Sequence, residues 1–493
     1  MNLISGRNNV RKKSIGINAV LNLIKVASTI LFPLITFPYI SRVLQVDNVG
    51  RINYGTSVVN YFALVAALGV NIYGVREGSR QKKGKQFDSF ASEVFSLNLL
   101  STAISYLTLI TLVLTVPKFR DYRSVILILS LSIVLTTFGI EWVNTVFEDY
   151  LYITLRSLVV QILCMVAMFV IIKKPEDYLK YALITVASSG ITCVANWIYC
   201  RRYTKLCLVF NASIFRHLRP MLIFFANHLA ITIYVTADTT MLGWMKGDFY
   251  SGLYAVSVKV YQCVKSLMTA VYMVTIPELS RLATSGDRGK YRKLLTDISC
   301  SIILLILPCM AGLIAFARNI IILISGTSYV EATLSLQILG VALLFAVASG
   351  VVVNCINTPN GMERYSLFAT VIAAIVNVIL NIFLIPVMAQ DGAALTTVIA
   401  EVTVFVICLI RISDVGSYVD VKEIAKQLLI AASGSCLVFG GKCFLDRCFT
   451  SSVVILLLGV LICPVLYAVF LGIVRDKYFL SVIRGGLKKI RRD

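Results

Sequence analysis

The sequence predicts an all-α integral membrane protein of about 14 transmembrane helices, built as two six-helix lobes followed by two C-terminal helices. Of its 493 residues, 58% are hydrophobic and only 14% are charged, whereas a soluble globular protein carries about 25% charged residues. The mean hydropathy of +0.85 reflects apolar segments that recur along the whole chain. A soluble enzyme, a secreted disulfide scaffold and a single-span receptor are therefore excluded as classes.

Apolar windows of about 20 residues place the individual helices, because that length crosses the hydrocarbon core of a bilayer. The first window follows a basic segment and superficially resembles a signal peptide. It is too long and lacks a small-x-small cleavage site, so we expect a transmembrane helix. The predicted spans are 14–40, 52–73, 91–116, 123–146, 150–172, 177–199, 220–243, 250–275, 294–317, 332–355, 364–388, 391–412, 424–445 and 451–474.

Basic residues are concentrated on one side of these spans. The 46 Lys and Arg residues, against 25 Asp and Glu, give a net charge of +21. Because basic loops stay in the cytoplasm, both termini and the basic tail at 475–493 are predicted to be cytoplasmic. The tail is expected to form an interfacial amphipathic helix, with a disordered basic segment as the alternative. Basic residues beside membrane spans set topology and bind anionic membrane lipid, so no nucleic acid partner is expected.

Two internal matches predict a duplication. VGRINYGTSV at 49–58 resembles SGLYAVSVKV at 251–260, and ALITVA at 182–187 resembles ALTTVI at 394–399. The alternative is chance similarity between apolar helices. The matches predict an N-terminal lobe over 1–200 and a C-terminal lobe over 201–412, with the last two helices, 413–474, outside the repeat. Repeated lobes of this kind usually flank a central substrate site.

The span at 14–40 has polar residues at helical spacing on one face, and the span at 52–73 repeats the pattern. Such stripes indicate a shared wet interior, whereas ordinary interhelical hydrogen bonding is the alternative and explains isolated polar residues. The ammonium of Lys25 favours the wet interior. We therefore take Lys25, Asn22 and Asn60 as candidate substrate-binding residues. The stripes consist of Ser14, Asn18, Asn22, Lys25, Thr29 and Thr36 in the first span, and Asn53, Ser57, Asn60 and Asn71 in the second.

The span at 250–275 places Lys265 on the same helical face as Tyr254 and Tyr261. Lys259 lies on another side of that helix, so the two lysines cannot both face one narrow cavity. A lysine at the membrane midplane costs at least about 2.5 kcal/mol, so it is expected to have a counter-charge or an anionic ligand. Lys265, Lys259 and Tyr261 are therefore further candidate substrate-binding residues.

Two acids lie far from helix ends, Asp238 in the span at 220–243 and Glu401 in the span at 391–412. Each is expected either to form a structural salt bridge with an internal lysine or to couple transport to a proton or cation. Arg156 and Glu93 lie nearer the ends of their spans and can reach water by snorkelling, so they are weaker candidates for an internal ion pair.

Arg42 and Arg51 are candidate substrate contacts at the outer, non-cytoplasmic end of the first two spans. The alternative is that they anchor lipid headgroups. No metal site or cofactor is expected, because the chain has only two His and no Cys pair with CxxC spacing. The sequence contains no GxxxxGK[ST], so it holds no nucleotide site for an ATP-driven transporter. It also lacks a DxD pair, and an enzyme is not expected.

Three stretches carry a family resemblance. The first, 32–77, contains Arg42 two residues before Leu44 and ends in YGVRE at 73–77; the others are 242–282 and 385–401. They resemble bacterial polysaccharide biosynthesis flippases of the multidrug/oligosaccharidyl-lipid/polysaccharide exporter superfamily. The resemblance spans most of 10–412. Gln45 stands where the family commonly has Gly, a departure at a loop.

The resemblance implies a MATE-like exporter fold and translocation of undecaprenyl-diphosphate-linked oligosaccharide repeat units, of the O-antigen type, across the bacterial cytoplasmic membrane by alternating access. Lys25 and Lys265 would then bind the diphosphate, and the last two helices would supply a lipid groove. Polysaccharide polymerase and export proteins would be partners. The nearest alternative is an ion-coupled multidrug or metabolite antiporter of the same superfamily, whose cavity should favour acidic residues.

Overall fold

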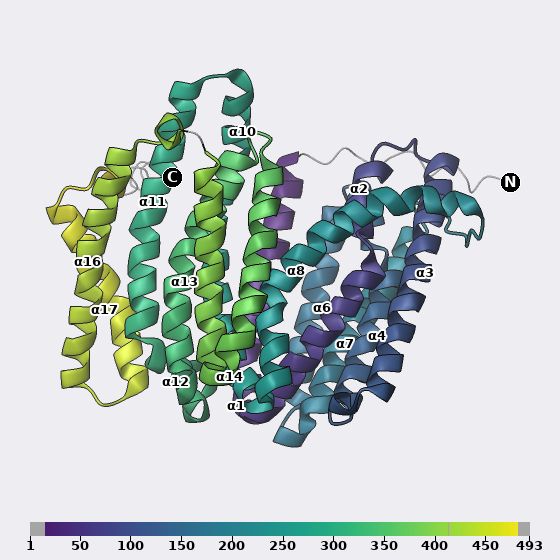
Figure 1. Ribbon diagram of the computed structural model, residues 1–493, viewed down its shortest axis with the longest axis horizontal. Helices are drawn as coiled ribbons and strands as arrows, with labels where there is room; N and C mark the ends of the chain where they lie inside the picture. The colour runs from purple at the N-terminus through teal and green to yellow at the C-terminus, as the bar shows by residue number, and fades with distance from the viewer. Residues whose placement is uncertain (1–14, 413, 482–493) are drawn as a thin grey trace. The chain divides into compact units, whose positions relative to one another are not determined.

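The computed structural model describes residues 15–412 and 414–481, and every regular element in these ranges is helical (Figure 1). The basic tail at 475–493 was predicted to form an amphipathic helix, and its residues 482–493 lie outside the described residues. The part of the chain that the structure describes is therefore an all-α protein, as predicted.

The helices follow one another with short connections. The first half of the chain contains α1 (Ile15–Ala67), α2 (Val70–Gly78), α3 (Lys85–Thr115), η1 (Pro117–Phe119), α4 (Arg123–Gly139), α5 (Glu141–Val146), α6 (Tyr150–Ile171), η2 (Pro175–Asp177), α7 (Tyr178–Cys200), η3 (Ala212–His217) and α8 (Leu218–Lys246). The second half contains α9 (Asp248–Met273), α10 (Ile276–Ser285), α11 (Arg288–Ala315), α12 (Ala317–Ser325), η4 (Thr327–Ala332), α13 (Thr333–Val351), η5 (Val352–Asn357), α14 (Glu363–Ile410), α15 (Val415–Tyr418), α16 (Val421–Cys448) and α17 (Ser452–Ile473).

The described residues contain 11 helical segments that are long and apolar enough to cross a membrane. Two of them, Val20–Gly78 and Glu363–Ile410, are 59 and 48 residues long, which exceeds a single crossing. Each is broken at a residue with positive φ, Gln45 at 64° and Ala389 at 46°, so each holds two of the predicted spans. Helix α9 is not among the eleven, but it forms where a span is predicted. Every predicted span thus corresponds to a helix.

Gly50 and Gly252 occupy equivalent positions of the predicted repeat, and each packs against the segment that precedes the other. A Cβ on Gly50 would lie 1.8 Å from the carbonyl oxygen of Asp248, and one on Gly252 would lie 2.1 Å from that of Val46. Only glycine fits either position without a shift of the backbone. A duplicated chain would make this kind of reciprocal contact, but the duplication and its lobe boundaries stay predictions.

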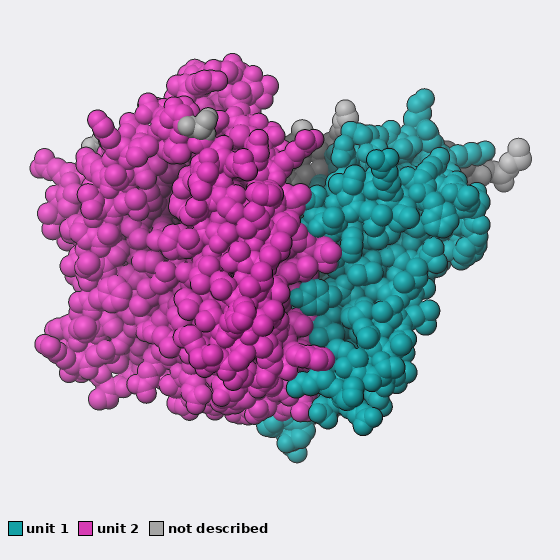
Figure 2. Space-filling model, in the orientation of Figure 1, with its two compact units in different colours: residues 1–36, 58–228 teal, residues 37–57, 229–493 magenta. Residues whose placement is uncertain are grey.

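The chain divides into two compact units, coloured separately in Figure 2: unit 1 is residues 1–36 and 58–228, and unit 2 is residues 37–57 and 229–493. Unit 1 has an aromatic core in which Phe87 and Phe90 both contact Trp142. Unit 2 has a larger apolar core, formed mainly where α13 packs against α9, α11 and α14. Helices α16 and α17 pack against each other, and α16 also packs against α11.

Candidate functional site

Lys265 and Glu401 form an ion pair inside unit 2, between α9 and α14. The Nζ atom of Lys265 lies 2.7 Å from Oε1 of Glu401, and the side chains are 33% and 5% exposed, respectively. The Tyr261 hydroxyl donates a hydrogen bond to the same carboxylate oxygen at 3.1 Å, and the ammonium lies 5.5 Å from the centre of the Tyr261 ring. The structure therefore brings together three of the residues selected from the sequence.

This ion pair lines a cavity of about 240 Å³ within unit 2. The cavity combines both candidate acids, Lys265, tyrosine hydroxyls and side-chain amides, with a few apolar residues. Lys259 is not among its lining residues, so of the two lysines in α9 it is Lys265 that faces this space. The lining residues are Tyr234, Val235, Asp238, Tyr254, Val258, Tyr261, Gln262, Lys265, Leu339, Asn377, Thr397, Ala400 and Glu401.

Asp238 is 4% exposed and is held by neutral donors. Its carboxylate accepts hydrogen bonds from Asn381 Nδ2 at 2.6 Å, Thr397 Oγ1 at 2.6 Å and the Tyr254 hydroxyl at 3.0 Å. The structure shows no Lys or Arg paired with Asp238 among the residues that it describes. A buried carboxylate with neutral donors alone has an unbalanced charge, which a proton or a monovalent cation can neutralise.

A second charged cluster lies in unit 1, around Glu141. Ile140 adopts a left-handed conformation with φ of 41°, which ends α4 and starts α5 at Glu141. Lys25 Nζ lies 2.7 Å from one oxygen of this carboxylate, and Arg156 Nη2 lies 3.2 Å from the other. Arg156 also donates a hydrogen bond to Asn196. Two cations share one carboxylate, so the cluster carries one net positive charge.

Two charged residues that were taken from the sequence as weaker candidates for an internal ion pair are buried and paired. Arg156 was placed near enough to a helix end to snorkel to water, but it is 9% exposed and pairs with Glu141. Glu93, treated in the same way, is 6% exposed and pairs with Arg216 and His217. Glu141 was not selected as a candidate, although a carboxylate inside the apolar window at 123–146 is the signal that would have identified it.

The other predicted site residues lie apart from the two ion-pair clusters. Arg42 donates hydrogen bonds to the carbonyl groups of Ile322 and Leu323 within unit 2, and Arg51 Nε lies 3.1 Å from Oδ2 of Asp248. Asn22 and Asn60 have exposed side chains in unit 1. Substrate contacts by Arg42, Arg51, Asn22, Asn60 and Lys259 stay predictions.

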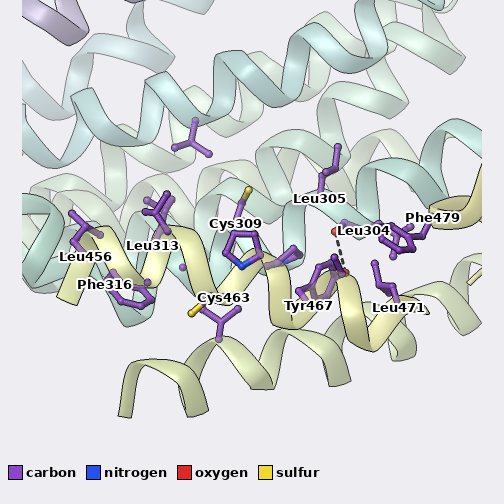
Figure 3. Close-up of a pocket in the computed structure, with 18 of the residues that line it drawn as sticks. Leu304, Leu305, Cys309, Leu313, Phe316, Leu456, Cys463, Tyr467, Leu471 and Phe479 are labelled. Carbon is purple, nitrogen blue, oxygen red and sulfur yellow. Dashed lines mark hydrogen bonds between the residues drawn. The ribbon is translucent and has the colours of Figure 1, made fainter. Parts of the chain in front are cut away.

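An apolar groove of about 640 Å³ is lined mainly by α11 and α17 in unit 2 (Figure 3). Two glycines and two prolines lie along it, and the Tyr467 hydroxyl is satisfied by the carbonyl oxygen of Leu304 at 3.0 Å. The groove therefore presents almost no free hydrogen-bonding group. Its lining includes Leu304, Leu305, Pro308, Cys309, Gly312, Leu313, Phe316, Leu456, Gly459, Cys463, Pro464, Tyr467, Leu471 and Phe479.

Comparison with known proteins identifies the family. A family model described as "Polysaccharide biosynthesis protein" matches residues 15–283, more than half of the chain. The chain belongs to the polysaccharide biosynthesis protein family. A second family model, described as "Lipid II flippase MurJ", matches residues 251–462. The family predicted from the sequence is thus confirmed.

Individual relatives of this polysaccharide biosynthesis protein agree with that assignment. A relative from Escherichia coli (strain K12), named as an O-antigen transporter, is 21% identical over 403 residues, which is 80% of this chain and 95% of the relative. The solved structure of the lipid II flippase MurJ in an inward closed conformation has a TM-score of 0.75 at 16% identity, covering 94% of this chain and 100% of that chain. An inward-facing MATE family multidrug resistance transporter has a TM-score of 0.56 at 15% identity, covering 80% and 98%.

These similarities fix the class of the protein. The structural neighbours show a MATE-like exporter fold, as predicted. The second family model, the relative and the structural neighbours are named as transporters or flippases, so this chain is a multi-pass membrane transport protein and not an enzyme.

Proposed function

We propose that this polysaccharide biosynthesis protein is a flippase that translocates undecaprenyl-diphosphate-linked oligosaccharide repeat units across the bacterial cytoplasmic membrane. Both termini would lie in the cytoplasm, and transport would proceed by alternating access. The observation that carries the proposal is Lys265, an ammonium held by Glu401 in a cavity with hydroxyls and amides inside a membrane-spanning unit. The family and the names of its relatives support the same substrate class.

In this proposal the internal lysines bind the diphosphate by exchanging partners. An ammonium that left its carboxylate without a new partner would be costly in the membrane, and a diphosphate supplies that partner. Each carboxylate keeps another contact after the exchange. Glu401 retains the hydrogen bond from Tyr261, and Glu141 retains Arg156 when Lys25 leaves. Lys25 in unit 1 and Lys265 in unit 2 are each proposed to bind diphosphate during the transport cycle.

The polyprenyl chain is proposed to occupy the apolar groove between α11 and α17. A long hydrocarbon needs a surface without unsatisfied polar groups, and the groove meets that requirement because the Tyr467 hydroxyl is already bonded to a carbonyl group. Polysaccharide polymerase and export proteins are proposed partners that would receive the flipped unit.

Asp238 is the proposed coupling residue. Its carboxylate is buried and bonded to neutral donors, so binding of a proton or a cation changes the net charge of the cavity that also contains Lys265. Such a change favours one conformation over another and links an ion gradient to substrate release. Glu401 is the second candidate for this role.

Deletion of the gene in the native host, followed by lipid extraction, tests the proposal. We expect a single lipid-linked repeat unit to accumulate and surface polysaccharide to disappear, and expression of the intact protein to restore both. Normal surface polysaccharide after deletion would instead support an ion-coupled antiporter of the same fold.

A further inference from the structure

Unit 1 contains a polar cavity of about 270 Å³ that is distinct from the charged cluster at Glu141. It lies where the end of α2, the start of α3 and the turn of η3 meet. Its lining consists of amide, hydroxyl, carboxylate and guanidinium groups with two aromatic rings. The lining residues are Tyr73, Glu77, Gln81, Gln86, Ser89, Phe90, Arg216 and His217.

A buried hydrogen-bond network fixes the inner wall of this cavity. His217 is 5% exposed and lies between two partners, with Nδ1 2.6 Å from the Tyr73 hydroxyl and Nε2 2.9 Å from Oε2 of Glu93. The same Glu93 oxygen lies 2.8 Å from Nη2 of Arg216. The network holds the Tyr73 ring and the Arg216 guanidinium in place, so the wall is preorganised for a ligand.

The charged groups at this cavity are already paired. Arg216 and His217 share Glu93, and Oε1 of Glu77 lies 3.0 Å from Nη1 of Arg80 and 3.6 Å from Nε of Arg76. A phosphate group would therefore find no unpaired cation here. A lipid chain is also a poor ligand, because most of the lining is polar.

Uncharged hydrogen-bonding groups remain available in the cavity. The side-chain amides of Gln81 and Gln86 make no hydrogen bond to any residue that the structure describes. Each offers two donors and one acceptor oxygen. Phe90 and Tyr73, whose ring centres lie 6.1 Å apart, add apolar surface beside these amides. Free amides next to aromatic rings match a molecule that has many hydroxyl groups on a ring.

We propose that this cavity is a saccharide-binding site that holds a sugar of the lipid-linked oligosaccharide before the substrate enters the membrane. The inference rests on the proposed function and adds a separate recognition site to it. The α2–α3 connection is part of a basic hairpin at 76–88, and we expect this hairpin in the cytoplasm because basic loops stay there. The site then faces the side on which the substrate is made. Gln81 contacts the sugar hydroxyls, Gln86 lies at the rim beside the bound sugar, and the Glu93–His217–Tyr73 network positions the wall that contacts the ring.

Photo-crosslinking in the native host tests the site without knowledge of the sugar. The photo-reactive residue p-benzoylphenylalanine replaces Gln86, which is exposed at the cavity rim, and adducts are identified by mass spectrometry. The matched control is Lys82→p-benzoylphenylalanine, because Lys82 is exposed on the same hairpin but does not line the cavity. We expect a saccharide-bearing adduct at 86 and none at 82. Adding Gln81→Ala should lower its yield about fivefold, the effect of one lost hydrogen bond.

A third position separates this inference from the proposed function. Gln262 is exposed and lines the Lys265 cavity, so p-benzoylphenylalanine at 262 reports on the proposed transport site. Saccharide adducts at 262 with none at 86 would overturn the saccharide site and leave the proposed function standing. No saccharide adduct at either position would contradict both. A saccharide adduct at 86 supports the site, and the presence of a polyprenyl mass in it separates a lipid-linked sugar from a soluble one.

Discussion

Replacing Lys265 by methionine removes the ammonium that pairs with Glu401, and the expected loss of stability follows from the burial of that carboxylate. The Glu401 side chain is 5% exposed and keeps the hydrogen bond from the Tyr261 hydroxyl at 3.1 Å. Breaking a buried ion pair by removing one partner costs about 3–5 kcal/mol, because the other charge is left buried. Lys265 is 33% exposed, so solvent screening lowers the expected loss to about 2–3 kcal/mol.

A double variant separates the structural role of this pair from substrate binding. Lys265→Met/Glu401→Gln removes both charges and leaves residue 401 able to accept a hydrogen bond from Tyr261. Stability should return to within about 1 kcal/mol of the wild type, because uncharged replacements of a buried pair are close to neutral. Flipping should stay at least about tenfold lower, because a charge-assisted hydrogen bond to the diphosphate, worth about 1.5–3 kcal/mol, is missing. Lys265→Arg keeps a cation and should retain part of the activity.

Two measurements on the same variants decide the question. Thermal unfolding of the purified proteins in detergent reports stability, and surface polysaccharide in a complemented deletion strain at matched expression reports transport. A stable double variant that displays wild-type polysaccharide would show that Lys265 does not bind the diphosphate. Wild-type thermal stability of Lys265→Met would show that the buried-pair reasoning is wrong.

Three further predictions address coupling, the lipid groove and topology. Asp238→Asn should abolish the dependence of flipping on an ion gradient in proteoliposomes while substrate binding persists; unchanged dependence would move the coupling role to Glu401. Gly312→Leu should fill the apolar groove, since its Cβ meets nothing within 4 Å, and lower flipping several-fold. Gly440→Leu has equal space outside the groove and should leave flipping unchanged, so equal activity of the two variants would rule out a lipid in the groove. Lys83→Cys should resist a membrane-impermeant maleimide in intact cells, and strong labelling would reverse the predicted topology.

The helices were predictable from the sequence because the bilayer imposes a simple requirement on them. A span needs about 20 apolar residues, and a window of that length finds it even inside α1 and α14, where two spans join at Gln45 and Ala389. Helix α9 was found in the same way despite its lysines and tyrosines. Charged residues inside the spans were also informative, since their cost makes them rare. That reasoning selected Lys265, Glu401 and Asp238.

Contacts between residues of different helices were harder to predict from the sequence. The depth of Arg156 along its own helix suggested contact with water, but the packing of α5 and α7 around it decides its burial. Its partner Glu141 was missed because the sequence does not show which helices pack around that carboxylate. From the sequence, only the last two helices were expected to supply a lipid groove. The walls of the groove also require α11, which is distant in sequence, so they could not be predicted. The polar cavity at Tyr73 depends likewise on segments that meet only in the folded chain.

Flipping by the purified protein in proteoliposomes tests the proposed function most directly. Lipid-linked oligosaccharide extracted from the deletion strain is reconstituted with the protein, and its saccharide is assayed from outside with an impermeant enzyme before and after an ion gradient is imposed. We expect the wild type to move the saccharide between leaflets, and Lys265→Met/Glu401→Gln to move it at least about tenfold more slowly. Suppose that the protein is correctly folded and that the saccharide still moves no faster than in protein-free liposomes, with or without the ion gradient. That result would contradict the proposed function.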